Sequence, residues 1–191
     1  MNNNYETYIK YLTKLLGEDI VSNLVAVLGE ENIKNASYAT TSDTGLAFAG
    51  SYVDTVLSLA EYASKINELL PLDKKTENAK IYKICLLSQI AKVQMFIPNN
   101  DEWQIKKQGK IYAFASLPGA LRVGERSLLI CNNAGIKFTE EEFEAMRIID
   151  KVKEEDNYSK YYSSALTVVI KQALEIINLI NKNGYVTQTQ G

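Results

Sequence analysis

Apolar residues recur at three- and four-residue intervals along most of the chain, which is the spacing of amphipathic helices. The longest such stripes predict helices over residues 5–16, about 18–28, about 50–70, about 76–91 and about 161–181. Shorter helices are expected after Ser127 and from the capping box formed by Thr139 and Glu142. We therefore expect an all-α fold, a helical bundle whose broadly apolar last helix lies at the centre or at a dimer contact.

Two stretches break the helical pattern. Residues 35–45 are rich in Ser, Thr and Asn, whose short side chains bond to the local backbone, so we expect a loop there. Its hydroxyls and amides suit a phosphate, although a solvated connection is the commoner role of such loops. Residues 102–114 alternate apolar and polar positions around a turn at Gly109, which predicts one small β-hairpin.

One polar pair interrupts the apolar helix that runs from Tyr82 to Val93. Ser88 and Gln89 lie among leucines and isoleucines, and Lys92 follows about one turn later. Such a pair either contacts a ligand or is bonded to a neighbouring carbonyl, and the sequence leaves both interpretations open. Lys92 offers a positive charge to an anion beside the pair, with a surface lysine as the alternative.

The composition of the chain restricts its possible binding partners and its cellular compartment. The 191 residues fit a single domain, with N-terminal helices over 1–34, a core over 45–180 and a flexible tail over 182–191. A net charge of -2 gives no broad attraction for DNA, RNA or acidic membranes. The N-terminus lacks a basic start followed by an apolar run, and no apolar segment approaches the roughly 20 residues that span a bilayer. We therefore expect a cytoplasmic protein without a nucleic-acid or membrane partner.

Histidine is absent from the sequence, which restricts the chemistry. Imidazole is a common ligand of catalytic zinc and the most frequent general base near neutral pH. Cys85 and Cys131 both lie in apolar helical patterns, where a cysteine packs as a small hydrophobe. We expect no cofactor and no bound transition metal. A Mg²⁺ or Ca²⁺ site built from carboxylates alone remains as an alternative.

Two motifs resemble those of the HD-domain phosphohydrolases, in particular the HD-like proteins of phages and mobile elements. The first is Leu86-Leu87-Ser88-Gln89 followed by Lys92-Val93, and the second is Gly124-Glu125-Arg126-Ser127. The resemblance implies an HD-like helical core with the hairpin as a lid. It also implies that the positions of the family's metal ligands are held here by Asp54, Ser88, Gln89, Val123, Ile149 and Leu174. Because the whole ligand set is replaced while its frame is kept, we expect a pseudo-enzyme whose pocket serves binding.

The resemblance and the basic residues together predict a ligand. The expected function is to bind and sequester a phosphorylated small molecule, a nucleotide or a nucleotide-derived immune signal in a phage-like setting. The residues expected to hold it are Ser88, Gln89, Lys92, Asp54, Arg122, Arg126, Arg147, Trp103 and Tyr112. Arg122 and Arg126 suit a phosphate at a helix start as well as a plain salt-bridged helix entry. Trp103 and Tyr112 suit the stacking of a base as well as the packing of a hairpin.

Two alternative functions stay open. The apolar face of the last helix suits a scaffold or regulatory protein that acts through helix-mediated contacts, including contacts between copies in a homo-oligomer. The other alternative is a divergent phosphohydrolase with a cation held by Asp54 and Asp150.

Overall fold

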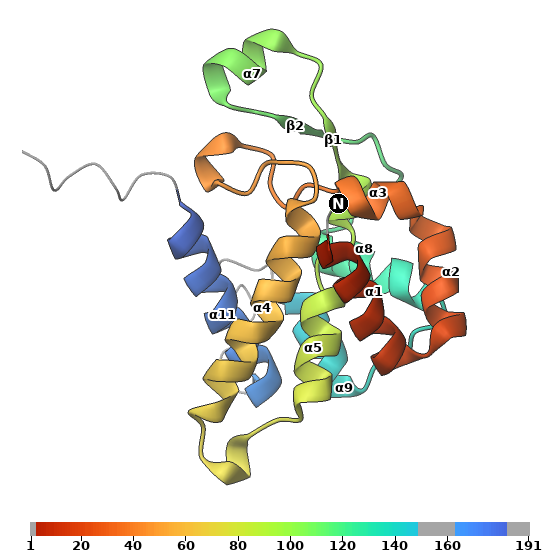
Figure 1. Ribbon diagram of the computed structural model, residues 1–191, viewed down its shortest axis with the longest axis vertical. Coiled ribbons are helices and arrows are strands. Elements are labelled where there is room, and N and C mark those ends of the chain that lie inside the picture. Colours follow the sequence, from red (N-terminus) through yellow and green to blue (C-terminus); the bar gives the residue numbers. More distant parts are fainter. Residues whose placement is uncertain (1–2, 149–162, 183–191) are drawn as a thin grey trace, which may run out of the picture.

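The computed structural model describes residues 3–148 and 163–182. Its helices are α1 Asn3–Leu16, α2 Glu18–Leu28, α3 Glu30–Asn35, α4 Ser51–Glu68, α5 Asn78–Leu87, α6 Lys92–Met95, α7 Glu102–Gln108, α8 Val123–Asn133, α9 Glu140–Ile148 and α11 Ala165–Asn181 (Figure 1). Short 3-10 helices cover Ser42–Thr44 and Leu72–Lys74, and the strands are β1 Phe96–Pro98 and β2 Tyr112–Phe114. The predicted all-α class with one small antiparallel sheet is confirmed. The predictions for Ile149, Asp150, the charged run 151–156 and the tail from 183 fall outside the described residues.

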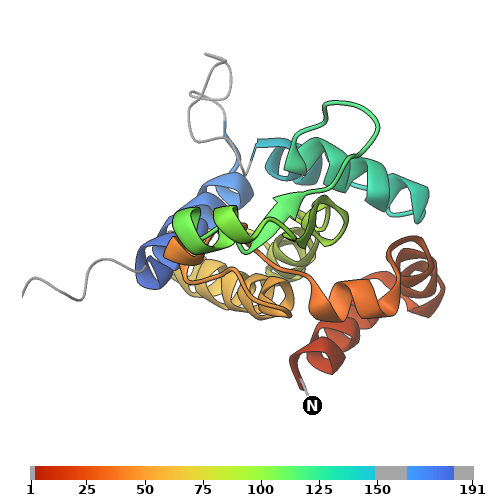
Figure 2. The same ribbon diagram turned by 90° about the horizontal axis from the view of Figure 1, so that it is seen from above.

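The bundle is organised around α4 and α5. α11 lies along α4, while α1 packs against α5 on the opposite side with α2 outside it (Figures 1 and 2). α9 also packs against α5, and α8 lies between α9 and α2. α11 buries one face, including Leu166 and Ala173, and leaves Ile180 exposed near its end. It begins at Ala165 rather than near residue 161, because the Ser164 side chain accepts a hydrogen bond from the Thr167 amide and caps the first turn.

Two buried tyrosines tie α1 and α4 to the end of α5. The hydroxyls of Tyr8 and Tyr52 both donate to the Leu86 carbonyl oxygen, at 3.3 and 3.0 Å, and their rings meet edge to face at 6.2 Å between centroids. A carbonyl has two lone pairs, so one oxygen satisfies both buried donors. The helices therefore converge on the residues that immediately precede Ser88.

The predicted helix through Ala91 is wrong at its C-terminal end. α5 stops at Leu87, and the chain continues through a turn of i to i+3 hydrogen bonds, such as Ile90 N to Leu87 O at 3.1 Å. The Ala91 amide leaves the helical ladder and donates to Ser127 Oγ at 3.1 Å. This alternative acceptor on α8 offsets the lost intrahelical bond. The predicted start is also shifted, since Glu77 rather than Thr76 precedes the first turn of α5.

The predicted hairpin exists, but its first strand was misplaced. β1 pairs antiparallel with β2, Phe96 opposite Phe114, and the segment between them contains α7. The side chain of Asp101 accepts from the Gln104 amide and caps α7, and Lys106 pairs with Glu102 one turn earlier at 2.7 Å. These local polar contacts outweigh the short apolar alternation that suggested a strand. We call residues 96–114 the arm, which extends from one end of the bundle (Figure 1).

The loop after α3 is packed and holds the base of the arm. Ser37 and Tyr38 are buried, so the predicted solvated connection is wrong for this part of the loop. The Ser37 hydroxyl donates to the Ala39 carbonyl, so its proton already has an acceptor within the loop. Backbone bonds then join loop and arm, from Ser42 N to Gly109 O at 2.8 Å and from Tyr112 N to Thr40 O at 3.1 Å.

Replacing Gly109 with alanine is expected to detach the arm from this loop. Gly109 has φ +61, and an added Cβ would meet Ser42 Oγ, the end of a side chain that can turn away. The left-handed backbone costs roughly 1–2 kcal/mol in a non-glycine residue, and displacing the Ser42 side chain adds a smaller amount. We expect a lower urea midpoint and faster hydrogen exchange at the Ser42 and Tyr112 amides. Gly119→Ala is the matched control, because Gly119 has φ +77 with open space around it; equal exchange in both variants would contradict the role of the Ser42 contact.

Candidate functional site

The polar pair of the central motif lies where three segments meet. The Gln89 side-chain nitrogen donates to the Tyr38 hydroxyl at 2.7 Å, which links the turn after α5 to the loop after α3. The Lys92 ammonium lies 3.3 Å from the centroid of the Tyr38 ring. The Ala91 amide links the same turn to α8 through Ser127. We call this region the motif junction, and it comprises Tyr38, Ser88, Gln89, Lys92, Arg126 and Ser127.

Tyr38 acts as the neutral partner of Gln89. Burial raises the pKa of the Tyr38 phenol well above its usual value, and the hydrogen bond from Gln89 opposes that shift only in part. The phenol therefore stays protonated over the physiological range, and its oxygen accepts the bond from Gln89. Gln89 is 2% exposed, so the interpretation of a buried polar residue bonded to a neighbour describes this side chain, with a hydroxyl as the partner.

Two polar atoms of the junction are buried without a hydrogen-bond partner. They are Ser88 Oγ and Arg126 Nε, and within the described ranges no other buried side-chain nitrogen or oxygen shares this property. Each is close in sequence to one end of the Ala91–Ser127 hydrogen bond, Ser88 three residues before Ala91 and Arg126 next to Ser127. An unsatisfied buried polar group costs roughly 1–3 kcal/mol, so native proteins keep few of them without a reason.

The rest of the Arg126 guanidinium is bonded to the loop before α8. Its terminal nitrogen donates to the carbonyl oxygens of Pro118 and Gly119, at 2.9 and 3.0 Å, and the residue is 6% exposed. The predicted phosphate position at this helix start already has a carboxylate, because Glu125 accepts from the Arg122 amide at 2.9 Å. Arg122 itself lies on the surface. The two arginines of the second motif therefore face different surroundings.

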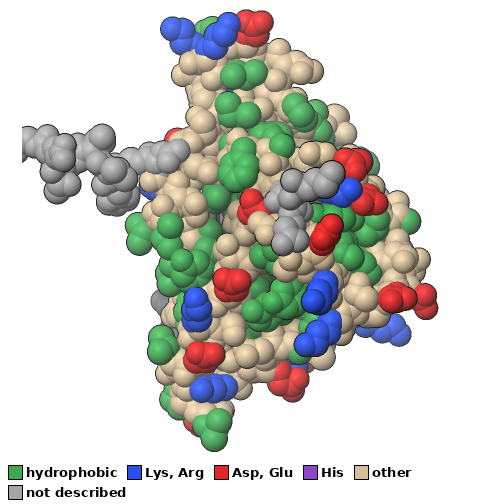
Figure 3. All heavy atoms as spheres, in the orientation of Figure 1, with side chains coloured by type: hydrophobic (Ala, Val, Ile, Leu, Met, Phe, Trp, Pro, Cys, Tyr) green, Lys and Arg blue, Asp and Glu red, His purple; other side chains and the backbone are tan. Residues whose placement is uncertain are grey.

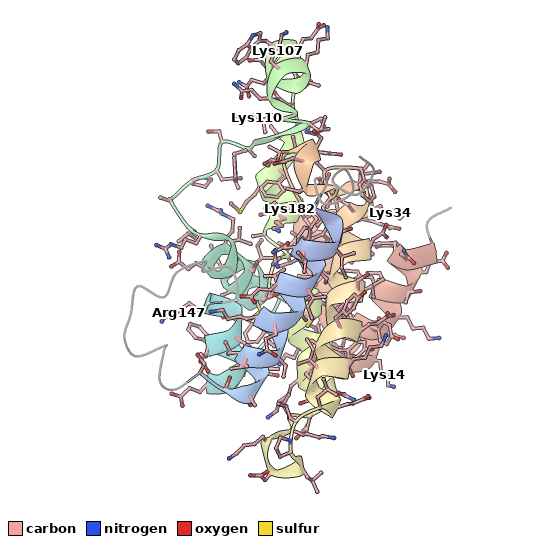
Figure 4. The ribbon with its side chains drawn as sticks, turned by 90° about the vertical axis from the view of Figure 1, so that its left-hand side faces the viewer. Lys14, Lys34, Lys107, Lys110, Arg147 and Lys182 are labelled. Carbon is pink, nitrogen blue, oxygen red and sulfur yellow. The ribbon has the colours of Figure 1, made fainter. Side chains whose placement is uncertain are left out.

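The remaining predicted ligand residues lie elsewhere. Asp54 accepts a hydrogen bond from Asn4 on α1 at 2.8 Å. Arg147 is exposed on α9, well separated from the labelled lysines of the arm (Figure 4). Trp103 is 61% exposed on α7, whereas Tyr112 is buried and hydrogen-bonded to Ser37. Tyr112 therefore exposes little surface on which a base could stack, and its stacking role stays a prediction.

Sequence reasoning missed the tyrosines of this region. Tyr52, rather than Asp54 two residues later, is the α4 residue that reaches the motif, through the Leu86 carbonyl. Its place in the apolar stripe of the long helix was the available signal. Tyr38 gave a weaker signal in the sequence, because it lies among the Ser and Thr of a segment that resembles a solvated loop.

No group of three or more Cys, Asp and Glu residues in the described ranges is arranged to hold a metal ion, and Asp150 falls outside those ranges. None of the helices over 3–148 and 163–182 is long and apolar enough to cross a bilayer. Comparison with protein families, with curated proteins and with solved structures finds no match. The relationship to HD-domain proteins stays a prediction from the two motifs.

Proposed function

We propose that this protein binds a small phosphorylated ligand at the motif junction without catalysing a reaction. The observation that supports this most is the pair of unpartnered atoms, Ser88 Oγ and Arg126 Nε. Both can donate a hydrogen bond, and each belongs to one of the two motifs that resemble the HD-domain proteins. Phosphate oxygens are acceptors that can satisfy both atoms, and Lys92 at the edge of the junction adds a positive charge.

Part of the protein has to move before such a ligand can enter the motif junction. Ser88 is 0% exposed, and Arg126 is covered by the loop whose carbonyls it holds. A phosphate that replaces the Pro118 and Gly119 carbonyls as the partner of Arg126 would release this loop. The Arg126 guanidinium would then be hydrogen-bonded both with and without the ligand, so its charge is never buried without a partner.

The identity of the ligand and its setting follow from the resemblance. We propose a nucleotide or nucleotide-derived immune signal, held by an HD-like pseudo-enzyme in the cytoplasm in a phage-like setting. The absence of histidine from the sequence agrees with a site that has lost the family's metal centre. Sequestration needs affinity alone, so a site without catalytic groups would suffice.

Calorimetric titration of mono-, di- and cyclic nucleotides tests this proposal through Ser88→Ala. With no ligand present, we expect this variant to unfold at a higher temperature, because it removes an unsatisfied hydroxyl that costs roughly 1–3 kcal/mol. The same change should weaken nucleotide binding about tenfold, and Lys92→Ala should do likewise. Arg147→Ala is the control, since Arg147 is exposed on α9 outside the junction. If no nucleotide binds the wild type, or Ser88→Ala leaves binding unchanged, the ligand proposal is overturned.

A specific observation also favours the scaffold alternative. Trp103, Phe114 and Ile97 of the arm are 61%, 66% and 46% exposed. Large apolar side chains grouped on a protruding element are typical of a protein contact. We therefore keep protein binding through the arm as the second candidate function.

A further inference from the structure

The exposed face of α7 combines one aromatic side chain with positive charge. Trp103, Lys106 and Lys107 follow one another at i, i+3 and i+4, so they share one side of the helix. Lys106 is paired with Glu102, whereas Lys107 and Lys110 have no ion pair within the described ranges. Three lysines against Asp101 and Glu102 give the arm a net charge of +1. Charged residues gather at this tip of the molecule (Figures 3 and 4).

A groove of opposite charge lies between α1 and α2. It has a volume of about 510 Å³, and its lining residues are Tyr5, Ile9, Thr13, Glu18, Val21, Ser22, Val25 and Ala26. Glu18 is the charged residue among them. Residues 3–35, which form these helices and α3, carry five carboxylates and three lysines, a net charge of -2. The groove therefore offers an apolar floor and an acidic setting.

A second groove of the same volume provides a comparison. It lies between α8 and α9, and its charged lining residue is Lys137. Glu18 in the lining of the α1–α2 groove attracts the lysines of the arm, whereas Lys137 in the lining of the α8–α9 groove repels them. Residues 123–148 carry five carboxylates against three basic residues, the same net charge of -2 as residues 3–35, so the lining residues are what distinguishes the two cavities.

We propose that the arm of one copy of this protein docks its Trp103 face into the α1–α2 groove of a second copy. The inference rests on the second candidate function, contact through the arm, and is independent of the ligand site. A tryptophan flanked by basic side chains is a frequent anchor of protein interfaces, and burying it removes roughly 150–250 Å² from water. A two-fold dimer contains the contact twice, arm to groove and groove to arm, so both contacts add to the affinity.

A protein partner fits this surface better than a nucleic acid. Only Lys107 and Lys110 of the arm lack a carboxylate neighbour, which is few for a surface that tracks phosphates. Ile97 offers apolar area without a stacking face for a base. Binding of single-stranded nucleic acid by the arm is the competing outcome of the test.

Sedimentation across about 1–200 µM protein tests the contact with three variants. We expect concentration-dependent association of the wild type and at least a tenfold weakening in Trp103→Ala. Ser22→Arg should weaken association similarly, because Ser22 is an exposed groove residue and the change introduces a bulky cation. Asn132→Arg is the matched control, an exposed helical position in the α8–α9 groove, and should associate like the wild type. Circular dichroism confirms that each variant folds.

Each part of the proposal is contradicted by a different experimental result. A wild type that stays monomeric throughout overturns self-association, and the arm would then require a different protein partner. Equal weakening by Asn132→Arg and Ser22→Arg overturns the choice of groove. Binding of a fluorescent oligothymidylate that is lost in Trp103→Ala overturns the choice of partner. Nucleotide titration of Ser22→Arg should match the wild type, so a failure of the proposed ligand site is distinguished from a failure of the arm contact.

Discussion

Raising the pH from about 8 to about 10.5 is expected to lower the free energy of unfolding by about 4 kcal/mol through the two buried cysteines alone. Cys85 and Cys131 are fully buried, and burial raises the pKa of both thiols above the usual 9.0, to about 12 for Cys131. Above pH 9 the thiols ionise in the unfolded chain but stay neutral in the folded one. The stability is therefore fully present below pH 9 and is lost as the pH rises toward the folded pKa. Each thiol contributes about 1.4 kcal/mol per pH unit in this window.

Urea unfolding at several pH values, with Cys85→Ala as the comparison, isolates this effect. The variant removes one of the two thiols, so the loss of stability per pH unit above pH 9 should fall by about 1.4 kcal/mol. The buried phenols of Tyr8, Tyr38 and Tyr52 act in the same direction at higher pH, because burial raises their pKa above 10.0. They are unchanged in the variant and cancel from the comparison. Identical pH profiles for the variant and the wild type would show that the thiol at position 85 does not carry the effect.

The apolar periodicity of the sequence predicted the helix bounds well where a helix packs a single apolar stripe against the core. The ranges 5–16 and 18–28 differ little from α1 and α2, since their stripes end at glycines that take positive φ. The capping box was also predictable, because Thr139 and Glu142 satisfy each other's amides whatever packs around them. Local chemistry decided these features, and local chemistry is readable in sequence.

Prediction failed where a distant partner decides the backbone. Nothing local to Ala91 indicates that its amide will bond to Ser127, yet this bond accompanies the end of α5. The alternation before Gly109 was equally misleading, because two residues of a strand pattern are too few to outweigh the Asp101 cap. At the candidate site, the motifs singled out Ser88, Gln89, Lys92 and Arg126, but the loop that supplies Tyr38 could be placed only in three dimensions.

Lys83→Met is expected to lower the free energy of unfolding by about 3 kcal/mol, the lower end of the cost when a buried ion pair loses one partner. The Lys83 ammonium lies 2.8 Å from a Glu142 carboxylate oxygen, and the two side chains are only 16% and 5% exposed. It also donates to the Lys137 carbonyl at 2.9 Å, so one cation links α5 to the segment that begins α9. Methionine fills similar volume but leaves the Glu142 carboxylate with the Thr139 amide as its remaining partner. A buried charge that loses its counter-ion is costly, which is the reason for the expected loss.

The neighbouring ion pair provides a matched control for this prediction. Lys80 and Glu141 join the same two helices at 3.3 Å, but their side chains are 32% and 31% exposed. Water screens and solvates this pair, so Lys80→Met should shift the urea midpoint much less than Lys83→Met. Adding Glu142→Gln to Lys83→Met should recover part of the loss, because a neutral amide no longer requires the ammonium. If Lys80→Met and Lys83→Met shift the midpoint equally, burial does not distinguish the two pairs, and Lys83 would have no special role in joining α5 to α9.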